Sequence, residues 1–119
     1  MRLTGQVEKG WGHEIIFATT DKYCGKLLVF ENSKEFSMHF HAVKDETWYV
    51  LDGHFEVVWI DTETADEYTT ELLAGDTWHN PPLLPHKIRC IKSGTIIEVS
   101  TADSVEDNYR VQTGSSQSV

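Results

Sequence analysis

Hydrophobic and polar residues alternate with a period of two along most of the chain, and helical spacing does not persist over any window longer than about ten residues. This alternation is typical of strands that bury one face. Turn-forming segments rich in Gly, Pro, Asp and Asn separate the alternating runs. The sequence therefore predicts an all-β fold with strands at residues 13–19, 26–31, 35–41, 46–52, 54–61, 67–73, 76–80, 86–91 and 95–101.

The number and spacing of these strands favour a sandwich or a jelly-roll barrel, because no helical segment is long enough to cross over between parallel strands. A length of 119 residues suits a single domain. We expect a barrel at residues 13–103 and a lead segment at 1–12. Residues 104–119 are expected to form a partly disordered tail, because the polar end TGSSQSV cannot bury enough surface to order itself.

The strand expected at residues 35–41 has two unlike faces. Phe36, Met38 and Phe40 alternate with polar residues that include His39 and His41. If the imidazoles point into the barrel, the apolar face needs cover from a second layer of the chain or from another subunit. The second alternative leads us to expect a homodimer.

Charge and cysteine content narrow the range of partners. Nineteen acidic residues against ten Lys and Arg give a net charge of −9, which repels a polyanion, so we expect no nucleic-acid partner. Cys24 and Cys90 lie far apart without a CxxC spacing, and we expect reduced, partly buried thiols. The N-terminus lacks the apolar stretch of a secretory signal, and no run of about 18 apolar residues occurs, so we expect a cytoplasmic protein with no membrane partner.

Four side chains have the chemistry and spacing of a metal site. His39 and His41 lie two apart on an expected strand, so their imidazoles leave the same face. Glu46 follows on a strand expected to run back beside the first, and His86 begins a later strand after a proline-rich loop. Three imidazoles and one carboxylate would accept one divalent ion, and Zn, Fe, Mn, Ni, Co and Cu are all compatible. The alternative is a coincidental HxH pair, with core histidines that are simply hydrogen-bonded.

These residues fall in two segments, HFHAVKDETWYVLDG and GDTWHNPPLLPH, that resemble the paired motifs of the cupins. The first segment fits the cupin pattern without gaps at His39, His41, Glu46 and Gly53. The second fits at Gly75, Pro81 and His86, while Leu83 stands in place of the usual Gly. The resemblance implies a single-domain cupin jelly-roll barrel that holds a metal ion through the three imidazoles and the carboxylate.

A closer resemblance covers most of the chain. The segments KGWGHEIIFATTDKYCGKLLVF, KDETWYVLDG and IIEVSTADSVEDNYR resemble small stand-alone cupins related to the isomerase half of type II mannose-6-phosphate isomerases. This resemblance implies a metal-dependent enzyme acting on a sugar or sugar phosphate, and it makes Lys26 a cation that faces the substrate. Where that group usually carries Gln, this chain carries His39, and the group's ending of an acidic segment closed by Tyr-Gly-Arg is missing after Arg110.

Two further residues are candidates for proton transfer. Glu98 lies in mid-strand, an unusual place for a charge, and is either a general base near the metal or an ion-pair partner of Lys26. His79 precedes the proline-rich loop and could move a proton at the barrel mouth, although such a histidine is often only solvated.

Three aromatic residues are candidates for the substrate pocket. Trp48 shares a strand face with Glu46 and is expected to line the cavity, with Trp78 and Tyr23 at its rim. Aromatic platforms suit sugars or planar acids, and core packing would explain the same residues.

Three functions follow from these candidates, all with a small-molecule ligand. The first is a metal-dependent isomerase of sugars or sugar phosphates, which the overall resemblance favours. The second is a dioxygenase with a centre of three His and one Glu, favoured by His39. The third is a binding module without catalysis, for a carbohydrate or a small acid.

Overall fold

The computed structural model describes residues 5–104 and 106–111. These residues form eleven strands and no helix, which confirms the all-β prediction. Within these ranges, no helix that is long and apolar enough to span a membrane is therefore found.

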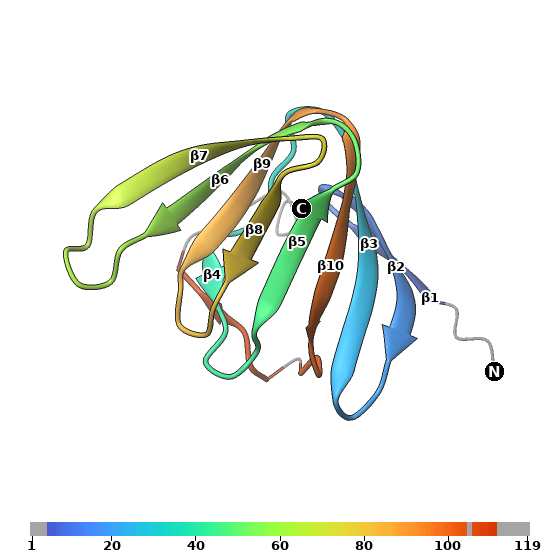
Figure 1. Cartoon of the computed structure of the whole chain (residues 1–119), viewed down its shortest axis with the longest axis horizontal. Helices are drawn as coiled ribbons and strands as arrows, with labels where there is room; N and C mark the ends of the chain where they lie inside the picture. Colours follow the sequence, from blue (N-terminus) through green and yellow to red (C-terminus); the bar gives the residue numbers. More distant parts are fainter. Residues whose placement is uncertain (1–4, 105, 112–119) are drawn as a thin grey trace.

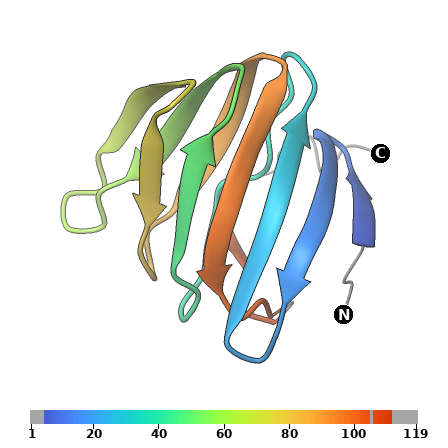
Figure 2. The same cartoon turned by 45° about the vertical axis from the view of Figure 1, so that its right-hand side comes forward.

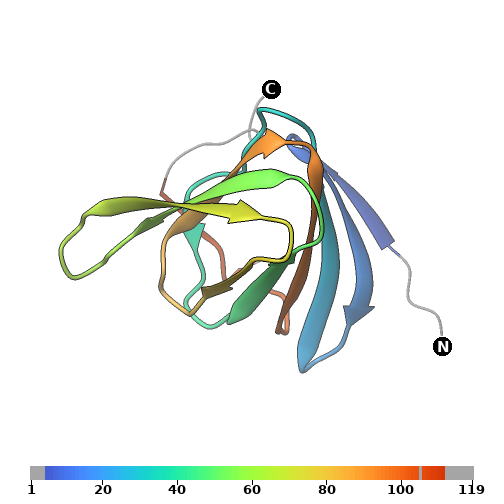
Figure 3. The ribbon, with the colours of Figure 1, turned by 45° about the horizontal axis from the view of Figure 1, so that its top comes forward.

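The strands form two antiparallel sheets that face each other, as in a jelly-roll barrel (Figures 1 and 2). One sheet has the order β1 (Gly5–Lys9), β2 (Gly12–Thr19), β3 (Tyr23–Phe30), β10 (Gly94–Thr101), β5 (Glu46–Val50) and β8 (Thr77–Asn80). The other has the order β11 (Tyr109–Arg110), β4 (His39–Phe40), β9 (His86–Lys92), β6 (His54–Ile60) and β7 (Glu67–Leu73). The hairpin of β6 and β7 extends away from the rest of the barrel (Figure 3).

Eight of the nine expected strands are present, with ends shifted by three residues or fewer. The expected strand at residues 35–41 is the exception, because only His39 and Phe40 belong to a strand. Phe36 is buried and packs edge-on against Trp48, at a ring-centroid distance of 5.9 Å. The predicted alternation over residues 35–38 is therefore wrong, since a segment that is not part of a continuous ladder does not have to alternate its faces.

The apolar side chains of this segment are covered by the chain itself. Met38 is fully buried, and the ring of Phe40 is stacked on Tyr109 of β11 at a centroid distance of 5.1 Å. Of the two kinds of cover expected for this face, the second layer of the same chain is the one observed.

Both ends of the chain contribute more to the sheets than expected. Residues 5–9, placed in the lead segment by the sequence, form β1 and pair with β2. Residues 109–110, placed in the tail, form β11 and pair with β4. These pairings are long-range contacts that a local hydrophobic pattern does not reveal. Residues 113–119, the expected loose end, lie outside the described residues.

The inner faces of β3, β10 and β5 change character along the barrel. At one level the cross-strand neighbours Leu28, Ile96 and Val50 are apolar and buried. Two residues further along each strand, the neighbours are Lys26, Glu98 and Trp48. The barrel therefore has an apolar end and a polar end.

Candidate metal centre

The four expected ligands approach one another from both sheets at the polar end. His39 on β4 lies directly across the ladder from His86 on β9, with ring centroids 4.7 Å apart. The ring of His41 lies 5.1 Å from that of His39 and 6.2 Å from that of His86. Glu46 comes from the facing sheet, because β5 pairs with β10 and β8. The expectation that the strand of Glu46 runs beside that of His39 is therefore wrong, although both strands still reach the same region.

Each imidazole is oriented by a backbone carbonyl. The Nδ1 atom of His39 lies 2.7 Å from the oxygen of Ser37, and that of His86 lies 2.8 Å from the oxygen of Leu84. The Nδ1 atom of His41 bonds the carbonyl oxygen of Asp107. Because a carbonyl oxygen only accepts, each Nδ1 carries the proton. In the neutral rings Nε2 then carries no proton, and its lone pair is free to bind a metal ion, as in many metal-bound histidines.

One of these Nε2 atoms is buried without a hydrogen bond. Nε2 of His86 lies 3.1 Å from Oε1 of Glu46, yet no group among the described residues makes a hydrogen bond with it. A buried polar atom in this state is costly unless another group satisfies it. A divalent ion between the imidazole and the carboxylate would do so, and therefore the donor set fits a metal ion.

The histidines are also held in the protonation state that a metal requires. Burial, together with the neighbouring His86, lowers the pKa of His39 to about 3. Burial likewise lowers the pKa of His41. Both rings are therefore neutral near pH 7 and free to act as ligands.

The ligands have not converged on a common point. Among residues 5–104 and 106–111, no three His, Cys, Asp or Glu side chains are gathered closely enough to hold an ion as they stand. Glu46 instead accepts a hydrogen bond of 3.2 Å from Nδ2 of Asn80 and lies 3.3 Å from Nζ of Lys44. Ion binding would thus require the carboxylate and the rings to move closer together.

A cavity of about 480 Å³ lies beside these residues. Its wall includes His39, His41 and Glu46 of the expected ligands, and Trp48, Lys26 and Glu98 of the other expected residues. Sequence analysis missed several residues of the site. Lys44 and Asp103 line the cavity, and Asn80 is the cross-strand neighbour of Glu46 and donates a hydrogen bond to it.

Lys44 is the centre of a buried charge network. Its Nζ lies 3.0 Å from Oε2 of Glu98, 2.9 Å from Oδ1 of Asp103 and 3.3 Å from Oε2 of Glu46. Burial opposes the charge of Lys44, but the neighbouring carboxylates outweigh this effect and raise its pKa. The sequence held a signal for Lys44, because it lies two residues before the expected ligand Glu46, in a short turn between two strands that carry expected ligands.

Lys26 and Glu98 are cross-strand neighbours, but each has another partner at ion-pair distance. Nζ of Lys26 lies 2.7 Å from Oδ2 of Asp103 and 3.6 Å from Oε1 of Glu14. Burial and the nearby Glu46 raise the pKa of Glu98 to about 7, against the opposing charges of Lys44 and Lys26. A carboxyl group with a pKa near neutrality can both accept and release a proton.

The other three candidates do not line the cavity. His79 is exposed and forms a hydrogen bond of 2.6 Å with Oδ1 of Asp45, and Tyr23 is 56% exposed. Both border a shallower hollow of about 350 Å³ elsewhere on the six-stranded sheet. Trp78 is the cross-strand partner of Trp48 and donates a hydrogen bond of 2.6 Å to Oδ1 of Asn80, which in turn contacts Glu46. The structure therefore does not bring His79 or Tyr23 to the cavity and gives Trp78 an indirect contact with Glu46.

Residues 26–101 match the family of the Cupin domain, which is more than half of the chain, and the protein therefore belongs to this family. No curated protein matches it in sequence.

Solved structures with the same fold include two oxalate decarboxylases. The enzyme of Bacillus subtilis, described with Mn(II) centres, is 17% identical with a TM-score of 0.78, over 91% of this chain and 30% of that chain. The Lactobacillus farciminis enzyme in its formate complex is 16% identical with a TM-score of 0.78, over 91% of this chain and 34% of that one. The chain thus spans about a third of the length of these enzymes.

A third neighbour has nearly the same length. KdgF from Halomonas sp. is 21% identical with a TM-score of 0.71, over 87% of this chain and 89% of that chain. At such identities, these comparisons establish the shared fold of the chains.

Proposed function

We propose that this cupin binds one divalent metal ion through His39, His41, Glu46 and His86 and isomerises a sugar or a sugar-phosphate-like molecule. The observation that carries the metal site is the buried Nε2 of His86, which has no hydrogen bond among the described residues and faces Glu46 at 3.1 Å. The three neutral imidazoles, each with Nδ1 bonded to a carbonyl, support the same assignment.

The residues around the cavity are suited to moving a proton between two carbons. A divalent ion at this site would polarise a carbonyl oxygen of the substrate and stabilise the charge that develops there. Glu98 would take a proton from the hydroxyl-bearing carbon beside the carbonyl and return it to the former carbonyl carbon. The hydroxyl proton would pass to the former carbonyl oxygen, so the reaction consumes no co-reactant. Lys44, at 3.0 Å from Glu98, keeps that carboxylate in place, and Trp48 supplies an apolar wall.

The charges along the cavity favour a substrate with an anionic end. Lys26 and Lys44 are already neutralised by carboxylates at ion-pair distance. Lys9 and Arg110 also line the cavity, and within residues 5–104 and 106–111 neither has an ion-pair partner. These two cations are available for a phosphate or a carboxylate, while the inner part of the cavity offers hydrogen-bonding groups to hydroxyls.

The dioxygenase alternative is favoured by one observation, the presence of a third imidazole at His39 close to the other ligands. Three imidazoles and one carboxylate are compatible with a redox metal that has open positions. Oxygen consumption by the iron-loaded protein with an enol or diol substrate would support this alternative over isomerisation.

The first test is metal analysis of protein purified without added metal, before and after reconstitution. About one ion per chain is expected in the wild type and in His79→Ala, whose imidazole lies outside the cavity, and almost none in His86→Ala. Less than about a tenth of an equivalent in the wild type, with no uptake on reconstitution, would overturn the metal site.

The second test addresses the reaction. Mannose 6-phosphate and fructose 6-phosphate are incubated with the loaded protein in deuterated water. Exchange of the proton at C2 of mannose 6-phosphate, or of a proton at C1 of fructose 6-phosphate, is followed by NMR. Exchange should occur with the wild type and be lost in Glu98→Gln. Full metal binding without any exchange would refute isomerisation of these sugar phosphates and leave the dioxygenase and the binding module as the alternatives.

The homodimer also stays a prediction. Phe17, Tyr49 and Val99 expose apolar side chains from three strands of the six-stranded sheet, with exposed fractions of 46%, 44% and 54%. Apolar residues gathered on one sheet face support association with a second copy. Sedimentation velocity of the wild type, with Val99→Lys as the disrupting variant, would show whether a dimer forms.

A further inference from the structure

The carboxylate of Asp107 binds three successive backbone N–H groups of the loop that joins the ligand strands. Its Oδ1 accepts from Ala42 at 2.7 Å, and its Oδ2 accepts from Val43 at 3.1 Å and from Lys44 at 2.9 Å. Burial opposes ionisation of Asp107, but the hydrogen bonds from Lys44, Ala42 and Val43 outweigh it and lower the pKa of this carboxyl group. One side chain therefore holds three of the four residues of the loop between His41 and Glu46.

The same residue holds a metal ligand through its main chain. The carbonyl oxygen of Asp107 accepts the Nδ1 proton of His41, across a sequence separation of 66 residues. This bond sets both the tautomer and the direction of the His41 ring. The ring would otherwise be weakly fixed, because β4 is only two residues long and ends just before His41.

Asp107 is itself held in place by the residues that follow it. Tyr109 and Arg110 pair with Phe40 and His39 as β11, and the N–H of Val111 donates a bond of 2.6 Å to the oxygen of Met38. This C-terminal segment lies beyond residues 26–101, the part of the chain that matches the cupin family. Asn108 and Arg110 of this segment line the cavity.

We propose that Asp107 is a positioning residue of the metal centre, which fixes the tautomer and direction of His41 and the path of the loop to Glu46. The inference rests on the proposed metal site. Its physical basis is that outer partners of metal-bound histidines pre-orient the ligand, and their loss costs about 10- to 100-fold in metal affinity. Asp107 adds to this by placing the backbone of Lys44, whose ammonium group contacts Glu46.

The variant Asp107→Ala keeps the main-chain carbonyl but releases the loop. Glu106→Ala is the matched control, because it removes an exposed acid from the neighbouring position. Competition titrations with Mn(II) and Zn(II) should show an affinity lower by about 10- to 100-fold in Asp107→Ala and unchanged in Glu106→Ala. Asp107→Asn retains one carbonyl acceptor for the loop and should restore part of the affinity, and it replaces the alanine variant if that variant fails to fold.

A second readout does not depend on any metal. Long-range ¹H–¹⁵N NMR spectra of the metal-free protein show which nitrogen of His41 carries the proton. The wild type and Glu106→Ala should show Nδ1–H. Asp107→Ala keeps the carbonyl group, but its side chain no longer ties residue 107 to the loop that follows His41, so the carbonyl and the ring can separate and a mixture with Nε2–H is expected.

Equal metal affinity and an unchanged His41 tautomer in Asp107→Ala would overturn the inference while leaving the proposed function intact. If the wild type takes up no metal, the proposed function fails. The tautomer of His41 then decides alone whether Asp107 positions the ring.

Discussion

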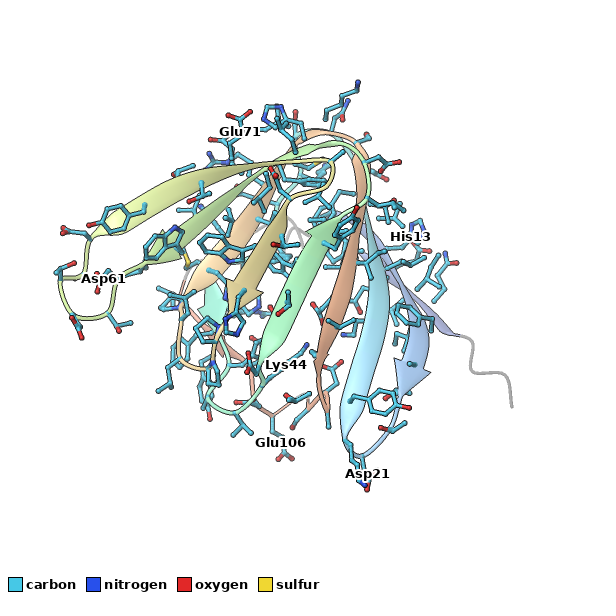
Figure 4. All side chains as sticks on the ribbon, in the orientation of Figure 1. His13, Asp21, Lys44, Asp61, Glu71 and Glu106 are labelled. Atoms are coloured by element: carbon cyan, nitrogen blue, oxygen red, sulfur yellow. The ribbon has the colours of Figure 1, made fainter. Side chains whose placement is uncertain are left out.

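The two ends of the barrel are built on the same strands and differ in their chemistry. Figure 4 shows Lys44 at the lower end of β5 and Glu71 near the opposite end of the barrel. Around Leu28, Ile96 and Val50, the interior is closed by apolar side chains. Two residues away along each strand, Lys26 and Glu98 face the cavity instead. A single alternating pattern thus supplies both a core and a site, because consecutive inward positions need not share the same chemistry.

The two ends are also held together by different forces. The apolar end relies on burial and ring packing, as between Phe30 and Phe55, whose centroids are 5.2 Å apart. The polar end relies on charges that compensate one another, with the ammonium of Lys44 among three carboxylates. Such a network is tolerated only while each buried charge keeps its partners. We therefore expect the apolar end to provide most of the stability and the polar end to provide ligand binding.

The largest effect is expected from Phe55→Ala at the apolar end. This side chain is fully buried, and its truncation should lower the free energy of unfolding by about 3–5 kcal/mol. The loss is this large because the cost of the cavity left behind adds to the lost free energy of transferring the ring out of water. Urea unfolding of the metal-free protein measures the change. A loss below about 1 kcal/mol would contradict the assignment of stability to this end.

A somewhat smaller effect is expected from Lys44→Met at the polar end. The substitution leaves Glu98 and Glu46 buried without their shared cation, which should cost about 3 kcal/mol near pH 7. Adding Glu98→Gln should recover part of this loss, because it removes one of the uncompensated charges. The control is Lys92→Met, an exposed lysine at the end of β9, for which urea unfolding should show almost no change.

The smallest effect is expected from the pH dependence of Asp103→Asn. Burial opposes ionisation of Asp103, but the hydrogen bond from Lys26 and the charge of Lys44 outweigh it and lower the pKa to about 2. Since the unfolded value is about 3.9, this carboxylate stabilises the fold above about pH 4, and the contribution disappears as the pH falls to about 2.

The side chain of Asp103 is 39% exposed, so we expect at most about 1 kcal/mol. Urea unfolding between pH 2 and pH 6 should show the wild type and Asp103→Asn converging at low pH. Asp21→Asn, in an exposed turn, should follow the wild-type profile. A difference that does not vary with pH would show that the hydrogen-bonded shape of Asp103, rather than its charge, supports the polar end.

The strands and the ligand types were predictable from the sequence because both are local properties. A period of two marks a strand wherever a continuous ladder holds it, as along β5, where the residues from Glu46 to Val50 alternate strictly between buried and exposed. The pattern predicted a strand through Phe36, but this buried residue lies in a segment that is not part of a strand. It also missed β1 and β11, whose pairing depends on distant partners.

The partners within the site could not be read from local spacing. Asp103 and Asp107 lie beyond the last long strand in the sequence, yet they contact Lys26, Lys44 and the ring of His41. His79 and Asp45 are 34 residues apart in the sequence, and the pairing of β5 with β8 places them beside each other, outside the cavity.

The sequence by itself determined the all-β architecture, the positions of eight strands and the four candidate ligands, because periodicity and side-chain chemistry act over short distances. The tertiary structure decided that Glu46 faces the histidines from the opposite sheet, that Lys44 compensates three carboxylates and that Asp107 holds His41. These arrangements arise from pairing between strands that are far apart in the chain. Such pairing depends on the energy of the whole barrel rather than on any single segment.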